Sequence, residues 1–143
     1  MSKNNIVVYY SHPFESEIHG AAKLILDMLK KALPNWLFVN PFDSPLTEVW
    51  LKDPSNIATA KAIMCKDLKL ICQSDIVVAY LPDVPMAPRG VIGTPIEIFY
   101  SVYCSNTAVY CLTPFHHPWL MALDVYCTDD IDALIKKLEE LKE

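Results

Sequence analysis

Short apolar segments alternate with longer amphipathic segments along this chain, and that alternation constrains the fold more than any other feature. The clearest apolar segments are NIVVYY (5–10), IVVAYL (76–81) and AVYCL (108–112). Strands that lack a polar residue at every second position are typical of parallel sheets, which helices cover on both faces. The sequence therefore predicts an α/β fold in which helices connect successive parallel strands.

Two shorter segments complete the predicted sheet, with residues 36–39 as a second strand and residues 125–127 as a brief fifth one. Apolar residues at helical spacing predict helices from about 15 to 33, from about 53 to 73 and from 95 to 104, and a final helix capped by Thr128. Residues 46–52 are ambiguous, and residues 119–123 form a short helical turn. We predict one domain, residues 1–143, folded as a flavodoxin-like three-layer sandwich with a five-stranded parallel sheet in the order 2-1-3-4-5.

This strand order also predicts where a ligand binds. In such a sheet the topological switch point lies between the first and third strands, and ligands bind beside the loops that follow these strands. The two loops are residues 11–14 and residues 82–93, and the second contains three prolines and two of the three glycines of the chain. His12 lies in the first loop, where it could contact a ligand.

Charge and composition exclude several classes of function. The formal net charge is -5 and Lys and Arg do not cluster, which argues against a nucleic acid or a membrane surface as the main partner. No apolar run reaches about 18 residues, and the polar start MSKNN is unlike a signal peptide, so we expect a cytoplasmic protein. The chain lacks GxGxxG and the P-loop motif, and its four histidines lack metal-ligand spacing, so we predict no cofactor and no metal site. We expect the five cysteines to be buried, reduced thiols.

The segment GTPIE (93–97) begins the helix that follows the second loop. Pro95 suits the first turn of a helix and Thr94 its N-cap, and the carboxylate of Glu97 is stabilised near a helix N-terminus. Thr94 and Glu97 have the spacing of a capping box, in which the glutamate bonds back to the cap residue. The alternative is that Glu97 is held at the mouth of a ligand cleft, and the sequence alone leaves both open.

A second carboxylate is expected beside Glu97. Asp83 directly follows the third predicted strand, so Asp83 and Glu97 can face one cleft and divide the roles of nucleophile and proton donor. Asp67 lies near the end of the preceding helix. Asp83 could equally be a turn residue after a proline, and Asp67 an exposed helix position.

These segments resemble the nucleoside 2-deoxyribosyltransferase-like superfamily of flavodoxin-like enzymes. The matching features are the strand end AYLPD (79–83), the motif GTPIE (93–97), the helix EIFYSVY (97–103) and the upstream CKDL (65–68). The resemblance implies that Glu97 attacks the anomeric carbon of a nucleoside or nucleoside 5′-monophosphate, displaces the base and forms a glycosyl-enzyme ester. Another base, or water, would then collect the sugar, so the resemblance implies either exchange or cleavage of the N-glycosidic bond.

The resemblance also implies roles for other residues around the cleft. Asp83 would assist base departure, and Asp67 would recognise the base or support the site. Aromatic side chains near the loops could stack on the base, namely Tyr10, Phe14 and Tyr80. A 5′-phosphate could bind groups in the two loops and at the start of the helix, namely Ser11, Arg89, Gly93 and Thr94.

Two departures from the family pattern leave an alternative open. Residues 11–14, SHPF, contain no glycine where family members usually have one, and Val91 stands where many members carry an aspartate. The alternative is a non-catalytic nucleotide-binding or regulatory domain with the same fold. The apolar surface at Phe99, Tyr100 and Tyr103 could pack in the core or form the interface of a homo-oligomer, which the resemblance also implies.

Overall fold

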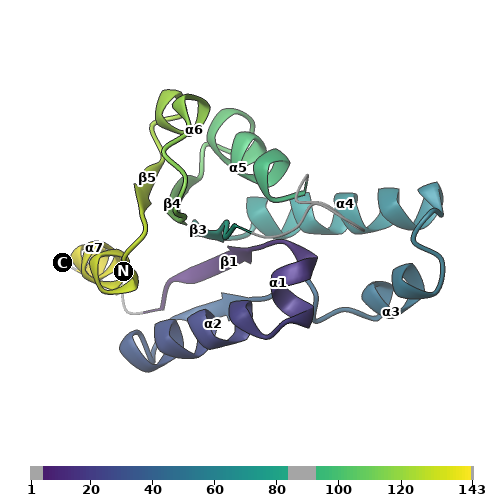
Figure 1. Ribbon diagram of the computed structural model, residues 1–143, viewed down its shortest axis with the longest axis horizontal. Coiled ribbons are helices and arrows are strands. Elements are labelled where there is room, and N and C mark those ends of the chain that lie inside the picture. The colour runs from purple at the N-terminus through teal and green to yellow at the C-terminus, as the bar shows by residue number, and fades with distance from the viewer. Residues whose placement is uncertain (1–4, 84–92, 143) are drawn as a thin grey trace.

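The computed structural model, which describes residues 5–83 and 93–142, contains a five-stranded parallel sheet (Figure 1). The strands are β1 (Val7–Ser11), β2 (Leu37–Val39), β3 (Ile76–Tyr80), β4 (Ala108–Leu112) and β5 (Tyr126–Thr128). Their spatial order is β2-β1-β3-β4-β5, and each strand is parallel to its neighbours. The predicted α/β fold and strand order are therefore confirmed.

Helices cover both faces of this sheet (Figure 1). One face carries α2 (Ala21–Ala32) and α7 (Ile131–Glu139), and the other carries α4 (Ile57–Cys72) and α5 (Gly93–Tyr103). Shorter elements lie in the connections, namely α1 (Phe14–Ile18), α3 (Pro45–Lys52), α6 (Pro118–Ala122) and the 3-10 turn η1 (Glu140–Lys142). The result is the predicted three-layer sandwich.

The strands are apolar along their length because both of their faces are buried. Side chains alternate across a strand, so Tyr10 and Val78 pack in the layer of α2 and α7, whereas Tyr9 and Val77 pack in the layer of α4 and α5. Each fully buried aliphatic side chain contributes about 2 kcal/mol through the removal of apolar surface from water. The same alternation places Ser11, two residues after Tyr9, on the face of the sheet where α4 and α5 lie.

The helix predicted from about residue 15 to 33 is divided into α1 and α2. Gly20 lies between them with φ of 79°, a left-handed conformation that glycine adopts without the steric cost of a Cβ atom. Apolar periodicity continues through this break, and therefore did not indicate it.

The ambiguous residues 46–52 belong to α3, whose N-cap Ser44 accepts a hydrogen bond from the backbone N–H of Leu46.

The last helix begins later than predicted, and Thr128 is not its cap. Asp130 is the N-cap of α7, and its Oδ1 accepts a hydrogen bond of 2.9 Å from the backbone N–H of Asp132. Thr128 is instead the last residue of β5, and its Oγ1 accepts a hydrogen bond of 3.1 Å from the backbone N–H of Asp130. Thr128 and Asp130 are both residue types that cap helices, and they lie two residues apart. Because β5 extends to Thr128, the cap of α7 is Asp130.

The cysteines are free thiols, but the expectation that all five are buried is wrong. Cys111 is buried in β4, whereas Cys65, Cys72 and Cys104 are exposed. Cys65 and Cys72 lie seven residues apart on α4, and this spacing puts both on one face of the helix, here the face turned to solvent.

The helix α5 exposes two aromatic side chains. Phe99 is 53% exposed and Tyr103 is 63% exposed, and their ring centroids lie 5.0 Å apart. Tyr100, between them, packs against the core. Self-association through this face stays a prediction.

No helix within residues 5–83 and 93–142 is long and apolar enough to cross a membrane.

Candidate functional site

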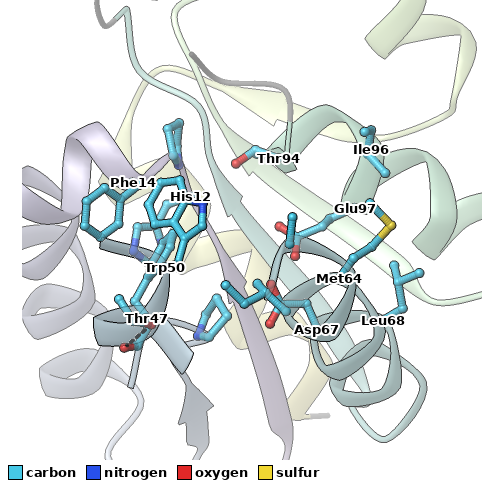
Figure 2. Close-up of a pocket in the computed structure, with 16 residues that line it drawn as sticks. His12, Phe14, Thr47, Trp50, Met64, Asp67, Leu68, Thr94, Ile96 and Glu97 are labelled. Atoms are coloured by element: carbon cyan, nitrogen blue, oxygen red, sulfur yellow. Dashed lines mark hydrogen bonds between the residues drawn. The ribbon is translucent and has the colours of Figure 1, made fainter. Parts of the chain in front are cut away.

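A cavity of about 390 Å³ lies at the carboxyl ends of β1 and β2, beside the start of α5. Its lining comes from the residues after β1, the residues after β2, and the helices α3, α4 and α5. Figure 2 shows His12, Phe14 and Trp50 on one side of the cavity and Met64, Asp67 and Glu97 on the other. Since α5 follows β3 in the chain, the cavity lies at the switch point between β1 and β3, where the strand order places ligands.

One wall of the cavity is aromatic. The ring of Phe14 makes edge-to-face contacts with Phe42 and Trp50, with centroids 5.1 and 5.2 Å apart, and His12 contacts Phe42 at 5.0 Å. Such edge-to-face packing orients the rings along this wall. A wall of this kind suits a flat, partly apolar ligand.

The opposite wall holds the carboxyl group of Glu97. Its Oε1 accepts a hydrogen bond of 2.8 Å from the hydroxyl of Ser11, and its Oε2 accepts a hydrogen bond from the hydroxyl of Tyr9. Glu97 lies in α5, whereas both donors lie in β1, so the side chain is directed at the sheet. These two bonds fix the orientation of the carboxyl group at the cavity.

The protein environment makes ionisation of Glu97 difficult. The residue as a whole is partly exposed, but protein surrounds its carboxyl group, and this burial raises the pKa to about 7. The hydrogen bonds from Tyr9 and Ser11 oppose the rise, whereas the negative charge of Asp67 adds to it. A carboxyl group with a strongly perturbed pKa in a cavity is a candidate functional group.

Asp67 is the second carboxylate of this wall. Burial raises its pKa, and the neighbouring Lys66, whose Nζ lies 3.0 Å from Asp67 Oδ1, opposes this rise. Burial and the nearby carboxylates raise the pKa of Tyr9, so its hydroxyl keeps its proton and donates a hydrogen bond to Glu97.

Of the two interpretations of Thr94 and Glu97 that the sequence left open, the capping box is wrong. In the described residues α5 begins at Gly93, so Thr94 is inside the helix, and the side chain of Glu97 bonds to β1. Thr94 is 1% exposed, and its Oγ1 has no hydrogen-bond partner among the described residues. Both Gly93 and Thr94 line the cavity.

His12 supports the cavity wall rather than standing free in it. Its Nε2 lies 2.6 Å from Glu17 Oε2, its Nδ1 lies 3.2 Å from the carbonyl oxygen of Tyr10, and the residue is 3% exposed. The hydrogen bond with His12 lowers the pKa of Glu17, which keeps this partner ionised. The imidazole ring is therefore oriented at both nitrogens while its face lines the cavity.

Several predicted residues lie elsewhere. The side chain of Asp83 is exposed at the end of β3 and does not line the cavity, and Arg89 lies outside the described residues. The hydroxyl of Tyr10 donates to the carbonyl oxygen of Ala22 in the opposite layer, where Tyr80 also packs. Ser11, His12, Phe14, Asp67, Gly93, Thr94 and Glu97 do come together.

Sequence reasoning missed Tyr9, Lys66, Phe42 and Trp50. The pattern VVYYS contained the signal for Tyr9, because residues two apart in a strand share a face and Ser11 was already a candidate. Lys66 and the two aromatic residues had no such signal. Phe42 and Trp50 line the cavity, and Lys66 contacts Asp67 and Pro41 beside it. These positions depend on how distant segments pack, which periodicity does not fix. Within the described residues, no group of three His, Cys, Asp or Glu side chains could hold a metal ion.

Comparisons with known proteins give the fold. No protein-family model matches the chain, and no characterised protein matches it by sequence. A 2-deoxyribosyltransferase from the psychrotolerant bacterium Bacillus psychrosaccharolyticus is similar in structure, with a TM-score of 0.60 and 19% identity over 90% of each chain. The SEFIR domain of IL-17 receptor B is also similar, with a TM-score of 0.55 and 16% identity over 98% of each chain. The chain thus has an α/β fold that an enzyme and a receptor domain share.

Proposed function

We propose that this protein is an enzyme that exchanges or cleaves the N-glycosidic bond of a nucleoside or a nucleoside 5′-monophosphate, with Glu97 as nucleophile. The observation that carries the proposal is the Glu97 carboxyl group, held by Tyr9 and Ser11 at a cavity whose opposite wall is aromatic. The cavity volume of about 390 Å³ is within the range of small-molecule sites. The structural likeness to a 2-deoxyribosyltransferase supports the same reaction class.

In the first step the ionised Glu97 attacks the anomeric carbon of the sugar. A carbon–oxygen bond forms, the bond to the base nitrogen breaks, and the base leaves with that electron pair and takes up a proton from water. In the second step an acceptor base or water attacks the same carbon, and the carboxylate is released. Tyr9 and Ser11 hold the carboxylate in position throughout, and Asp67 supports the site or recognises the base.

The aromatic wall suits the base. The opposite wall, called the acid wall because it holds the carboxyl groups of Glu97 and Asp67, suits the sugar. Trp50 lines the cavity on the side opposite Glu97 (Figure 2), so a base stacked on Trp50 leaves the anomeric carbon near the carboxylate. The start of α5, with the buried hydroxyl of Thr94, offers polar groups for the sugar or its phosphate. Base-departure assistance by Asp83 and phosphate binding by Arg89 stay predictions.

The test is a product assay with purified protein. A panel of deoxynucleosides and deoxynucleoside monophosphates is incubated with and without a second base, and bases and nucleosides are separated by chromatography. Release of free base indicates hydrolysis, and appearance of a new nucleoside indicates transfer. Glu97→Gln should lose at least 100-fold in rate, on the order expected for loss of a nucleophile. The exposed Glu139 on α7 provides the matched control Glu139→Gln, which should retain full activity.

A second candidate function is a non-catalytic nucleotide-binding or regulatory domain. The sequence feature that favours it is Val91, which stands where many members of the resembling family carry an aspartate, and the likeness to the SEFIR domain of IL-17 receptor B shows that a receptor domain has this fold as well. Calorimetry with the same panel separates the two. Binding of a nucleotide without turnover of any member of the panel supports the regulatory domain, and turnover that depends on Glu97 supports the enzyme.

A further inference from the structure

Lys66 has an unusual position for a lysine. It precedes Asp67 on α4, and its Nζ lies 3.0 Å from Asp67 Oδ1 and donates a hydrogen bond of 2.6 Å to the carbonyl oxygen of Pro41. Consecutive residues on a helix do not face each other, so the lysine side chain must bend toward its neighbour. Only 24% of the side chain is exposed. Ordering and partly burying a lysine costs free energy, which these two contacts offset.

One contact of Lys66 fixes the aromatic wall. Pro41 precedes Phe42, and the backbone N–H of Phe42 donates to Asn40 Oδ1 at 3.0 Å, while Asn40 Nδ2 donates to Glu17. The segment 40–42 is thus held at Asn40 from the side of α1 and at Pro41 from the side of α4. The contact with Pro41 therefore ties the segment that carries Phe42 to α4.

The other contact of Lys66 acts on the acid wall. The groups that face the Glu97 carboxyl group in the described part of the chain are Tyr9 and Ser11 from β1 and Asp67 and Lys66 from α4. Among them Lys66 is the cation. Its ammonium group directly neutralises Asp67 and acts through space on Glu97. Among the described residues, removal of this charge would leave two carboxyl groups and a tyrosine hydroxyl with no cation beside them.

We propose that Lys66 is a positioning residue that joins the two walls of the cavity. It keeps Asp67 ionised beside Glu97 and at the same time holds the segment of Phe42 at the distance that a bound base requires. The part of this inference that concerns the bound base rests on the proposed function. The part that concerns ionisation of the two carboxyl groups does not, because it can be measured without a substrate.

The first test follows the carboxyl groups directly. Protein labelled with 13C at Asp and Glu side chains is titrated by NMR, and the two signals are assigned by their loss in Glu97→Gln and Asp67→Asn. In Lys66→Met the ionisation steps of this pair should move to higher pH, the larger shift being about one pH unit. Lys66→Arg, which keeps the charge, should restore the parent curve. Lys69→Met removes an exposed lysine of the same helix and is the matched control.

The second test separates the two contacts. Lys66→Gln loses the charge but can still donate a hydrogen bond to Pro41, so it should shift the titration and leave the aromatic wall in place. In the product assay Lys66→Met should raise KM by roughly tenfold, the loss expected for one charge-assisted hydrogen bond, and Lys66→Gln should raise it less. Both should move the pH profile of kcat/KM upward.

The outcomes of these tests separate the role of Lys66 from the proposed function. If the folded Lys66→Met or Lys66→Gln protein titrates like the parent, or if Lys69→Met shifts the titration equally, the proposal for Lys66 is overturned. If Lys66→Met fails to fold, Lys66→Gln and Lys66→Arg still separate charge from hydrogen bonding. If the parent turns over no substrate while the titration shifts as expected, the proposed function fails and the ionisation role of Lys66 stands.

Discussion

Ionisation of Glu97 should oppose folding, so replacement of Glu97 by glutamine should stabilise the protein at high pH. Burial raises the pKa of Glu97 from an ordinary value of 4.5 to about 7. Between these values the folded state binds this proton more tightly than the unfolded state does. The free energy of unfolding therefore falls as pH rises from 4.5 to about 7, and the full loss is present above about 7. Glutamine cannot ionise, and it avoids this loss.

The size of the effect follows from the pKa difference. A rise from 4.5 to about 7, at about 1.4 kcal/mol for each unit of pKa, corresponds to about 3 kcal/mol. Because the residue is partly exposed, solvent screens some of this cost, and we expect about 2 kcal/mol at pH 8. For a chain of 143 residues this corresponds to a rise of about 6 °C in Tm.

Thermal unfolding followed by circular dichroism measures the effect. Parent and Glu97→Gln are compared at pH 5 and pH 8, with Glu139→Gln as the control for loss of an exposed carboxylate. The Glu97 variant should gain most of its stability at pH 8 and little at pH 5, and the control should change Tm by less than about 1 °C. An equal gain at both pH values, or no gain at pH 8, would refute the argument from burial.

Three further variants test the site and the fold. Tyr9→Phe removes a hydrogen bond that favours the ionised form of Glu97, so it should raise the pKa of Glu97 in the NMR titration. An unchanged titration would contradict this. Trp50→Ala removes part of the aromatic wall and should weaken nucleoside binding by about tenfold in calorimetry. The protein should stay folded at the assay temperature, so that the loss of binding is not a loss of folding. Gly20→Ala places a Cβ at φ of 79° and should lower the free energy of unfolding in urea by about 1 kcal/mol; an unchanged urea midpoint would argue against strain at this position.

The fold could be predicted because its main elements are encoded locally. Strands buried on both faces leave apolar runs in the sequence, and the run 108–112 coincides with β4. The strand order follows from the alternation of strands and helices and from the handedness of their connections. The break at Gly20 was missed because the apolar pattern of α1 continues into α2, and nothing in that pattern reports a positive φ.

The site could be predicted only in part, because its geometry depends on contacts between distant segments. The capping box for Thr94 and Glu97 used neighbours in sequence, whereas the actual donors to Glu97 come from β1, 86 and 88 residues earlier. The expectation that Asp83 shares the cleft relied on its place at the end of β3. The second carboxylate at the cavity is instead Asp67, which α4 brings beside Tyr9.

The fold alone does not choose between an enzyme and a regulatory domain, because one structural neighbour is a 2-deoxyribosyltransferase and another is a receptor domain. The free-energy cost of ionising Glu97 in the folded protein distinguishes an enzyme from a regulatory domain better than the fold does. A carboxyl group whose ionisation opposes folding is a disadvantage in a domain that only binds, whereas a nucleophile must accept this cost to become reactive. If Glu97 is the nucleophile, kcat/KM should rise with pH through about 7, over the range in which stability falls. Coincidence of these two midpoints supports an enzyme, and a loss of stability with no turnover at any pH supports a binding domain.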